Sequence, residues 1–258
     1  MVIIRDRPRL PVVNSKYLFQ RLIDLYQADL LRDVGSFDCA HALMFARPGM
    51  KVVALEANPG CAESMANDPA VGDAEIEVLA LAAWNKDEET TFNVIEFSAD
   101  GAPAWKNKLS SIRVRADNSY TSYEVKVRAV RLDSVVSGRI APAPSSIALW
   151  IDVEGVGYEV LEGIAGIRDV VSVIHIEVET TAFWVGQRLW PDILALMHDF
   201  GFSAVARSHA GMQCNVIFIS NTFRDKATFD VRWLILLAWA SRRAGSARSR
   251  IRQVLWRH

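Results

Sequence analysis

The sequence has 258 residues, and 51% of them are hydrophobic, which is enough for one sizeable buried core. A formal net charge of −1 gives no general attraction to nucleic acid, so we expect no nucleic-acid partner. The three cysteines are too few and too scattered for a disulfide framework or a zinc site.

An irregular arm and a helix are expected to open the chain. Residues 1–14 show no hydrophobic period and contain two prolines, and charged residues interrupt them, so no secretory signal is visible. From residue 15 to 31, apolar side chains recur at helical spacing, with Asn14 or Ser15 available as the N-terminal cap. We therefore predict an N-terminal arm and helix over residues 1–29.

Short apolar runs alternate with helix-compatible segments through most of the remaining chain. The runs cover residues 30–35, 51–57, 74–84, 146–154 and 170–179. This alternation predicts βαβ units, and hence an α/β fold with a mostly parallel sheet. The segment 201–220 reads as two strands joined by a turn at Ala210-Gly211, which predicts a closing antiparallel hairpin.

The middle of the chain does not follow this alternation. Thr90–Val94 and Glu124–Val130 have strand character, and the polar, turn-rich stretch between them holds Ser110, Ser111 and Asn118. We expect a strand or an excursion from the core here, rather than a core helix.

A basic tail follows the predicted α/β domain, which we place at residues 30–222. Residues 223–258 carry nine Lys or Arg against Asp225 and Asp230, about +7 (nine minus two), so the rest carries about −8 (−1 minus +7). A strongly apolar helix over Phe229–Arg243 should end or bend at Gly245. Its longest apolar run is well short of the ~20 residues of a membrane span, so we expect a cytoplasmic protein.

Such an amphipathic tail leaves several partners open. It is compatible with packing on the protein itself or on a second subunit, with peripheral contact at the inner membrane surface, and less readily with nucleic acid.

The first two predicted strands carry the signature of a ligand-binding edge. Asp33 and Gly35 end the first strand, where a glycine lets the backbone approach a ligand closely. Glu56 ends the second strand, 23 positions later (56 minus 33), where an acidic residue typically binds a ribose diol. Neither GxGxxG nor a Walker A sequence is present. An ordinary tight turn at Gly35 and a water-facing Glu56 are the structural alternatives.

Four segments together resemble the FkbM-type methyltransferases: DVGSFD (33–38), ALEANP (54–59), VRLDSV (130–135) and IDVEGVGYEVLEG (151–163). The resemblance covers residues 30–220 and implies a Rossmann-like class I methyltransferase fold. That fold has a seven-stranded sheet whose last strand is antiparallel. The resemblance also implies S-adenosylmethionine as the methyl donor, and methylation of a hydroxyl on a glycan or natural product.

The same resemblance implies a set of donor-binding residues. They lie in the loop after the first strand, at the end of the second strand, beside the adenine after the third strand, and next to the methionine portion after the fourth: Asp33, Gly35, Ser36, Phe37, Glu56, Ala57, Ala82, Ala83 and Asp152. The sequence departs from the family at Cys39, where a second glycine is usual, at Ala57 (usually proline) and at Phe37 (often asparagine).

Methylation of an alcohol needs a base to take its proton. Strand alternation places Glu154 beside Asp152, and His175 with Glu177 on one face of the next strand, so we select Glu154, His175 and Glu177, with Glu177 slightly preferred. Each has a plain structural alternative, such as pairing with an arginine. Magnesium remains an alternative for clustered acidic groups, but the spacing forms no dedicated ligand loop, and we predict no metal.

Phe183, Trp184 and Trp190 follow the fifth predicted strand, either as a lid over an acceptor or as core filling. The first functional hypothesis is an S-adenosylmethionine-dependent O-methyltransferase. The alternative is a catalytically inactive donor-binding module that docks through its basic tail. A nucleic-acid N-methyltransferase is set aside, because residues 152–155 lack the Asn/Asp-Pro-Pro-aromatic run of such enzymes.

Overall fold

A computed structural model describes residues 10–98, 109–117, 120–139 and 143–255. Its centre is a seven-stranded sheet in the order β3-β2-β1-β7-β8-β10-β9. All neighbouring strands pair in parallel except β10, which is antiparallel to both β8 and β9. The strands are β1 (Leu30–Val34), β2 (Lys51–Glu56), β3 (Glu77–Ala80), β7 (Ile147–Ile151), β8 (Val171–Glu179), β9 (Phe202–Arg207) and β10 (Gln213–Ser220). The predicted mixed sheet and the closing hairpin are confirmed.

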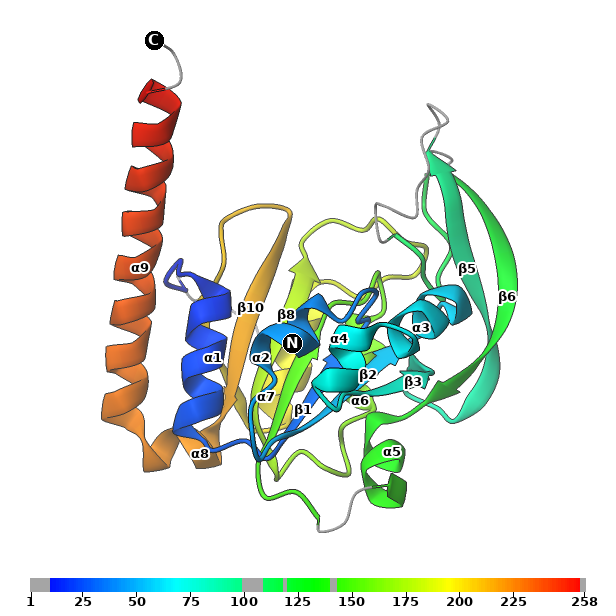
Figure 1. Cartoon of the computed structure of the whole chain (residues 1–258), viewed down its shortest axis with the longest axis horizontal. Coiled ribbons are helices and arrows are strands. Elements are labelled where there is room, and N and C mark those ends of the chain that lie inside the picture. The colour runs from blue at the N-terminus through cyan, green and yellow to red at the C-terminus, as the bar shows by residue number, and fades with distance from the viewer. Residues whose placement is uncertain (1–9, 99–108, 118–119, 140–142, 256–258) are drawn as a thin grey trace, which may run out of the picture.

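Helices cover both faces of this sheet (Figure 1). Buried side chains of α1 (Ser15–Leu25), α2 (Ala40–Phe45), α3 (Pro59–Ala66), α4 (Pro69–Asp73) and α9 (Thr228–Leu255) pack on one face. Those of α5 (Leu132–Arg139), α6 (Gly157–Glu162) and α7 (Trp190–Asp199) pack on the other. The short α8 (Asn221–Lys226) leads from β10 into α9. Both β1 and β7 are buried along their whole length. The sequence of β7 is therefore continuously apolar, whereas β1 also contains the buried Arg32 and Asp33.

The middle of the chain forms a separate small sheet. In it, β4 (Ala82–Ala83) pairs in parallel with β6 (Tyr120–Val130), and β6 pairs antiparallel with the long β5 (Glu88–Ser98). The expected excursion is therefore a β-hairpin, and it stands at the edge of the molecule opposite α9 (Figure 1). Asn118, which the sequence placed in the polar stretch between the strands, lies outside the described residues.

Two helices test the sequence rules for helix ends. Asn14 caps α1, since its side chain accepts a hydrogen bond from the backbone N–H of Tyr17. The predicted end at Gly245 is wrong, because α9 continues as one helix to Leu255. A single interior glycine costs about 1 kcal/mol relative to alanine, which is too little to end a helix whose nearby positions include the strong helix formers Ala244 and Ala247. Among the described residues, no helix is both long and apolar enough to cross a bilayer.

Candidate functional site

A cavity of about 390 Å³ opens at the carboxyl ends of β1, β2, β7 and β8. The sheet order reverses between β1 and β7, and ligands of open α/β sheets bind beyond the strand ends at such a switch point. The loops after these two strands are tied together, because the Asp152 backbone N–H donates to the Val34 carbonyl at 2.9 Å. The cavity is therefore where the sequence predicted the donor site.

Gly35 lines the cavity, but the structure gives a different reason for the glycine than the one expected. Its φ is +77°, and an added Cβ would lie 2.2 Å from the Asp152 backbone oxygen. Contact between the ends of β1 and β7 therefore requires a glycine here, whether or not a ligand is bound.

Asp33 and Ser36 brace the loop from behind the cavity wall. Asp33 is fully buried, and its Oδ2 accepts hydrogen bonds from the Ser36 hydroxyl at 2.7 Å and from the Ala42 N–H at 3.0 Å. Burial raises the pKa of the Asp33 carboxyl to about 7. Neither residue lines the cavity, so both hold the loop between β1 and α2 (residues 35–39) and the start of α2 in place rather than face a ligand.

Glu56 joins the two loops that flank the cavity. Its Oε2 accepts from the Phe37 N–H at 2.9 Å, and its Oε1 accepts from the Asn58 N–H at 2.7 Å. Each carboxylate oxygen can accept a second hydrogen bond. Because Glu56 also lines the cavity, it can receive the two hydroxyls of a ribose while keeping both loops in place.

Two non-glycine residues of the loop between β1 and α2 adopt left-handed backbone conformations. Phe37 has φ +55° and Cys39 has φ +57°, so the Cys39 position keeps the backbone that a glycine would favour. The Cys39 side chain is fully buried, and its Sγ contacts the Met65 Sδ at 3.6 Å. The departure from the family at Cys39 is thus accommodated by packing away from the cavity, while Phe37 lines it.

Apolar side chains from several elements form one wall of the cavity. Ala57, Ala82 and Ala83 line it as predicted. Phe92 and Val94 of β5 add to this wall, and sequence reasoning missed them because an excursion gives no clue to where it folds back. The wall is suited to a planar, weakly polar group such as adenine.

Carboxylates gather at the other end of the cavity. Asp152, Glu154 and Glu177 line it, and Glu179 is buried next to them in β8. Burial, reinforced by the neighbouring Glu177, raises the pKa of Glu154 to about 8. Burial and the charge of Asp152 raise the pKa of Glu177 to about 7. Gln213, missed from the sequence, donates to the Glu177 Oε2 at 2.7 Å and also lines the cavity.

His175 lies away from this group. It is fully buried in the middle of β8, with its ring stacked on Trp150 at a centroid distance of 3.5 Å and its Nε2 3.2 Å from the Ser15 hydroxyl of α1. Burial lowers the pKa of His175 well below its ordinary value. His175 does not line the cavity, so its position gives no support to the predicted catalytic role.

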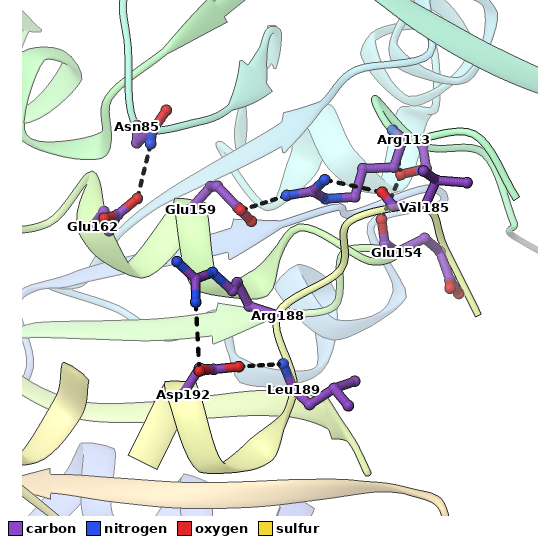
Figure 2. A network of polar contacts seen from close by, with 10 residues as sticks. Asn85, Arg113, Glu154, Glu159, Glu162, Val185, Arg188, Leu189 and Asp192 are labelled. Carbon is purple, nitrogen blue, oxygen red and sulfur yellow. Dashed lines mark hydrogen bonds and ion pairs between the residues drawn. The ribbon is translucent and has the colours of Figure 1, made fainter. Parts of the chain in front are cut away.

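The segment 109–117 covers the cavity near the carboxylates, a placement that the sequence did not reveal. The Ser111 hydroxyl donates to the Glu154 backbone oxygen at 2.5 Å. The Arg113 guanidinium donates to the Glu159 carboxylate at 2.5 Å and to the Val185 backbone oxygen at 3.0 Å (Figure 2). These contacts hold the segment against the loop after β7 and the loop after β8.

The aromatic residues after β8 contribute mainly to packing. Trp184 is 2% exposed and lies over Gly155, where an added Cβ would come within 2.4 Å of the indole ring. The Arg115 guanidinium lies 4.9 Å from the Trp184 ring centroid. Phe183 and Trp190 are partly buried against neighbouring apolar clusters. In the described part of the chain, no group of three or more His, Cys, Asp or Glu side chains is placed to hold a metal ion.

Comparison with known proteins gives one family. The Methyltransferase FkbM domain family matches residues 29–204. No curated protein matches the chain. The solved N-terminal domain of EvdMO1 with SAH bound is 12% identical, with 82% of each chain covered and a TM-score of 0.44. The bifunctional kinase-methyltransferase WbdD is 10% identical, with 81% of this chain and 38% of that chain covered and a TM-score of 0.46. An O-methyltransferase family protein from Burkholderia thailandensis is 9% identical, with 80% and 55% covered and a TM-score of 0.42.

The residues of the cavity fit the donor that this family uses. Glu56, Ala57, Ala82, Ala83 and Asp152, which the resemblance implied as donor contacts, all line this cavity. The family match spans well over half of the chain. This chain belongs to the FkbM methyltransferase family and is an S-adenosylmethionine-dependent methyltransferase.

Proposed function

We propose that this methyltransferase acts on a hydroxyl group of a carbohydrate or a related natural product. The observation that carries the proposal is the pair of carboxylates Glu154 and Glu177, which line the same cavity as the expected donor-binding residues. Glu154 lies in the loop after β7, and Glu177 lies near the carboxyl end of the neighbouring β8. A neutral alcohol is a weak nucleophile, so a carboxylate that accepts its proton is the group such a reaction needs.

The surroundings of these carboxylates suit proton transfer near neutral pH. Burial raises the pKa of Glu154 to about 8 and that of Glu177 to about 7, and a general base works best when its pKa is near the working pH. S-adenosylmethionine supplies an electrophilic methyl group when bound. One of the two carboxylates takes the hydroxyl proton as the acceptor oxygen attacks, and Gln213 orients the Glu177 carboxylate.

The polar lining of the cavity favours a neutral or cationic acceptor. Ser110, Ser111 and Asn58 offer hydrogen-bonding groups, and no Lys, Arg or His is among the described residues that line it. A phosphate or carboxylate on the acceptor would be repelled by Asp152, Glu154 and Glu177, and no cation among the described lining residues would offset that repulsion. We therefore expect acceptors with free hydroxyls and no negative charge.

Methyl transfer with labelled donor to a panel of neutral glycans and polyhydroxylated natural products tests the proposal. Glu154→Gln and Glu177→Gln should each be measured, and the variant that removes the base should lower kcat about 10²–10⁴-fold. For the wild type, kcat/KM should rise between about pH 6 and pH 8 as the base loses its proton.

Glu162→Gln is the matched control, because Glu162 accepts from the Asn85 side chain outside the cavity lining (Figure 2). That variant should keep the wild-type kcat and pH profile. Wild-type turnover in both test variants would refute the assignment of the base. A product methylated on nitrogen, or a base-labile methyl ester, would refute hydroxyl methylation.

A further inference from the structure

Helix α9 is apolar on two sides, and only one of them is covered. Val231, Leu234 and Ala238 are no more than 8% exposed and belong to the core on the α1 face of the sheet. The Asn14 N–H donates to the Ala238 carbonyl at 3.2 Å, which ties the start of α1 to α9. This side anchors the helix to the body of the protein.

The opposite side of α9 carries large apolar residues in contact with solvent. Phe229 is 81% exposed, Trp233 56% and Leu236 57%. At 3.6 residues per turn these three residues fall within about 60° of one another, on the side away from the buried residues. Scattered exposed apolar residues are ordinary, but a continuous stripe of them marks a contact surface. We call these three residues the exposed stripe.

The sequence that continues from the exposed stripe is strongly cationic. After Asp230 the chain contains no Asp or Glu, and it contains seven arginines, at positions 232, 242, 243, 248, 250, 252 and 257. The backbone of α9 stays helical to Leu255, so one helical rod carries both the stripe and most of these arginines. In Figure 1 this rod stands at one edge of the molecule and extends past α1.

We propose that α9 binds the surface of a membrane that contains anionic phospholipids. The exposed stripe enters the boundary between headgroups and acyl chains, and the arginines meet the lipid phosphates. An anionic bilayer satisfies both halves of the helix at once. Two copies that paired through this stripe would instead bring two cationic helices together, with repulsion between them.

Vesicle flotation of the full chain tests this proposal and does not depend on methyl transfer. The vesicles are phosphatidylcholine alone, and an equimolar mixture of phosphatidylcholine and phosphatidylglycerol. The chain should float with the anionic vesicles, and added salt should reduce binding. The triple variant Phe229→Ser, Trp233→Ser, Leu236→Ser should lose at least 10-fold in partition coefficient. Arg243→Gln, at a position that falls on the same side of the helix as the exposed stripe, should lose about fivefold, the scale for one cation near an anionic surface.

Met44→Ser with Tyr123→Ser is the matched control, because these exposed residues (49% and 47%) lie on α2 and β6, away from α9. This control should float like the wild type. Because the exposed stripe contributes little to the core, circular dichroism of the triple variant should match the wild type. Equal flotation of wild type and triple variant overturns the proposal. So does a chain that ignores both vesicles but forms a dimer that the triple variant loses.

Discussion

Gly35 and Gly49 share a left-handed backbone, with φ of +77° and +81°, but their surroundings differ. An alanine Cβ at Gly35 would lie 2.2 Å from the Asp152 backbone oxygen, whereas nothing lies within 4 Å of one at Gly49. Both alanine variants should lose about 1–2 kcal/mol for the left-handed conformation. Gly35→Ala should lose about 1–3 kcal/mol more, because the ends of β1 and β7 must move apart.

Urea denaturation of the two variants measures this difference directly. Equal losses in the free energy of unfolding would mean that the ends of β1 and β7 can move apart at no energetic cost. In that case, the glycine at position 35 would be needed only for its left-handed backbone conformation. Binding of the donor product provides a second measurement. Gly35→Ala displaces Asp152, which lines the cavity, whereas Gly49 lies outside the cavity lining. Only Gly35→Ala should weaken binding of S-adenosylhomocysteine in calorimetry.

Single residues also show what spacing along a sequence can predict. Glu56 could be placed at the cavity, because the end of a parallel strand is a fixed location in this fold. The position of His175 could not be predicted in this way, because alternation shows which face of a strand a residue occupies but not how far it lies from the carboxyl end of the strand. His175 shares a face with Glu177, yet it lies two residues earlier, under α1. Asp33 and Ser36 lie at the end of β1, where the resemblance implied donor contacts, but they hydrogen-bond to each other and neither lines the cavity.

At the level of elements, the segment 109–117 is held by the Arg113 guanidinium together with backbone hydrogen bonds of Ser111, Val114 and Ala116 to neighbouring strands and loops. The Arg113 and Glu159 side chains are 19% and 10% exposed, so their ion pair is sheltered from water. Arg113→Gln should cost about 1–3 kcal/mol, because it leaves a half-buried carboxylate without its cation. Hydrogen exchange of the backbone amides between residues 110 and 116 should accelerate, since the segment loses the guanidinium's hydrogen bonds to Glu159 and to the Val185 backbone oxygen, while the Val185 N–H bond to Val114 remains.

Arg188→Gln provides the comparison for this element. Arg188 pairs with Asp192 at 3.5 Å, but their side chains are 54% and 42% exposed (Figure 2). Exposed pairs contribute at most about 1 kcal/mol, so this variant should keep both stability and exchange rates close to the wild type. Identical exchange in the Arg113 and Arg188 variants would show that the segment is held by other contacts.

The large elements were the most predictable from sequence. The apolar runs 51–57 and 146–154 predicted the parallel strands β2 and β7, because a strand covered on both faces is apolar along most of its length. The pairing of β5 with β6 across 88–130 depends on contacts between distant residues, and local patterns do not encode where that sheet meets the cavity. For α9, packing of Val231, Leu234 and Ala238 anchors the helix, and local propensity alone overstated the effect of Gly245.

At the scale of the whole molecule, charge is divided between the two ends of the fold. The cationic α9 stands at one edge of the sheet, while buried carboxylates gather at the cavity. Burial raises the pKa of Glu154 and Glu179 to about 8 and that of Glu177 to about 7. Because folding raises the pKa values of these carboxylates, the free energy of unfolding depends on pH.

The direction of this link follows from proton counts. The unfolded chain releases these protons near the ordinary glutamate pKa of 4.5, while the folded protein keeps them until about pH 7 to 8. Between those values the folded state binds more protons, so the free energy of unfolding should fall as pH rises and level off above about pH 8. Each group adds a slope of up to about 1.4 kcal/mol per pH unit. Asp33, whose pKa is raised to about 7, acts in the same direction, and Asp29 and Asp133, whose pKa values are lowered, act only in more acidic solution. Burial lowers the pKa of His175, so His175 acts in the opposite direction below its ordinary value of 6.5, and the fall should be clearest between about pH 6.5 and pH 8.

Urea denaturation at intervals from about pH 5 to pH 9 measures this slope. Glu154→Gln should flatten it, because a neutral amide at that position has no proton to lose on unfolding. Glu63→Gln, an exposed position on α3, should leave the slope as in the wild type. A free energy of unfolding that stays constant or rises across this range would mean that the carboxylates around the cavity are charged in the folded protein. In that case, a catalytic base whose ionisation falls near neutral pH would lose its physical basis as well.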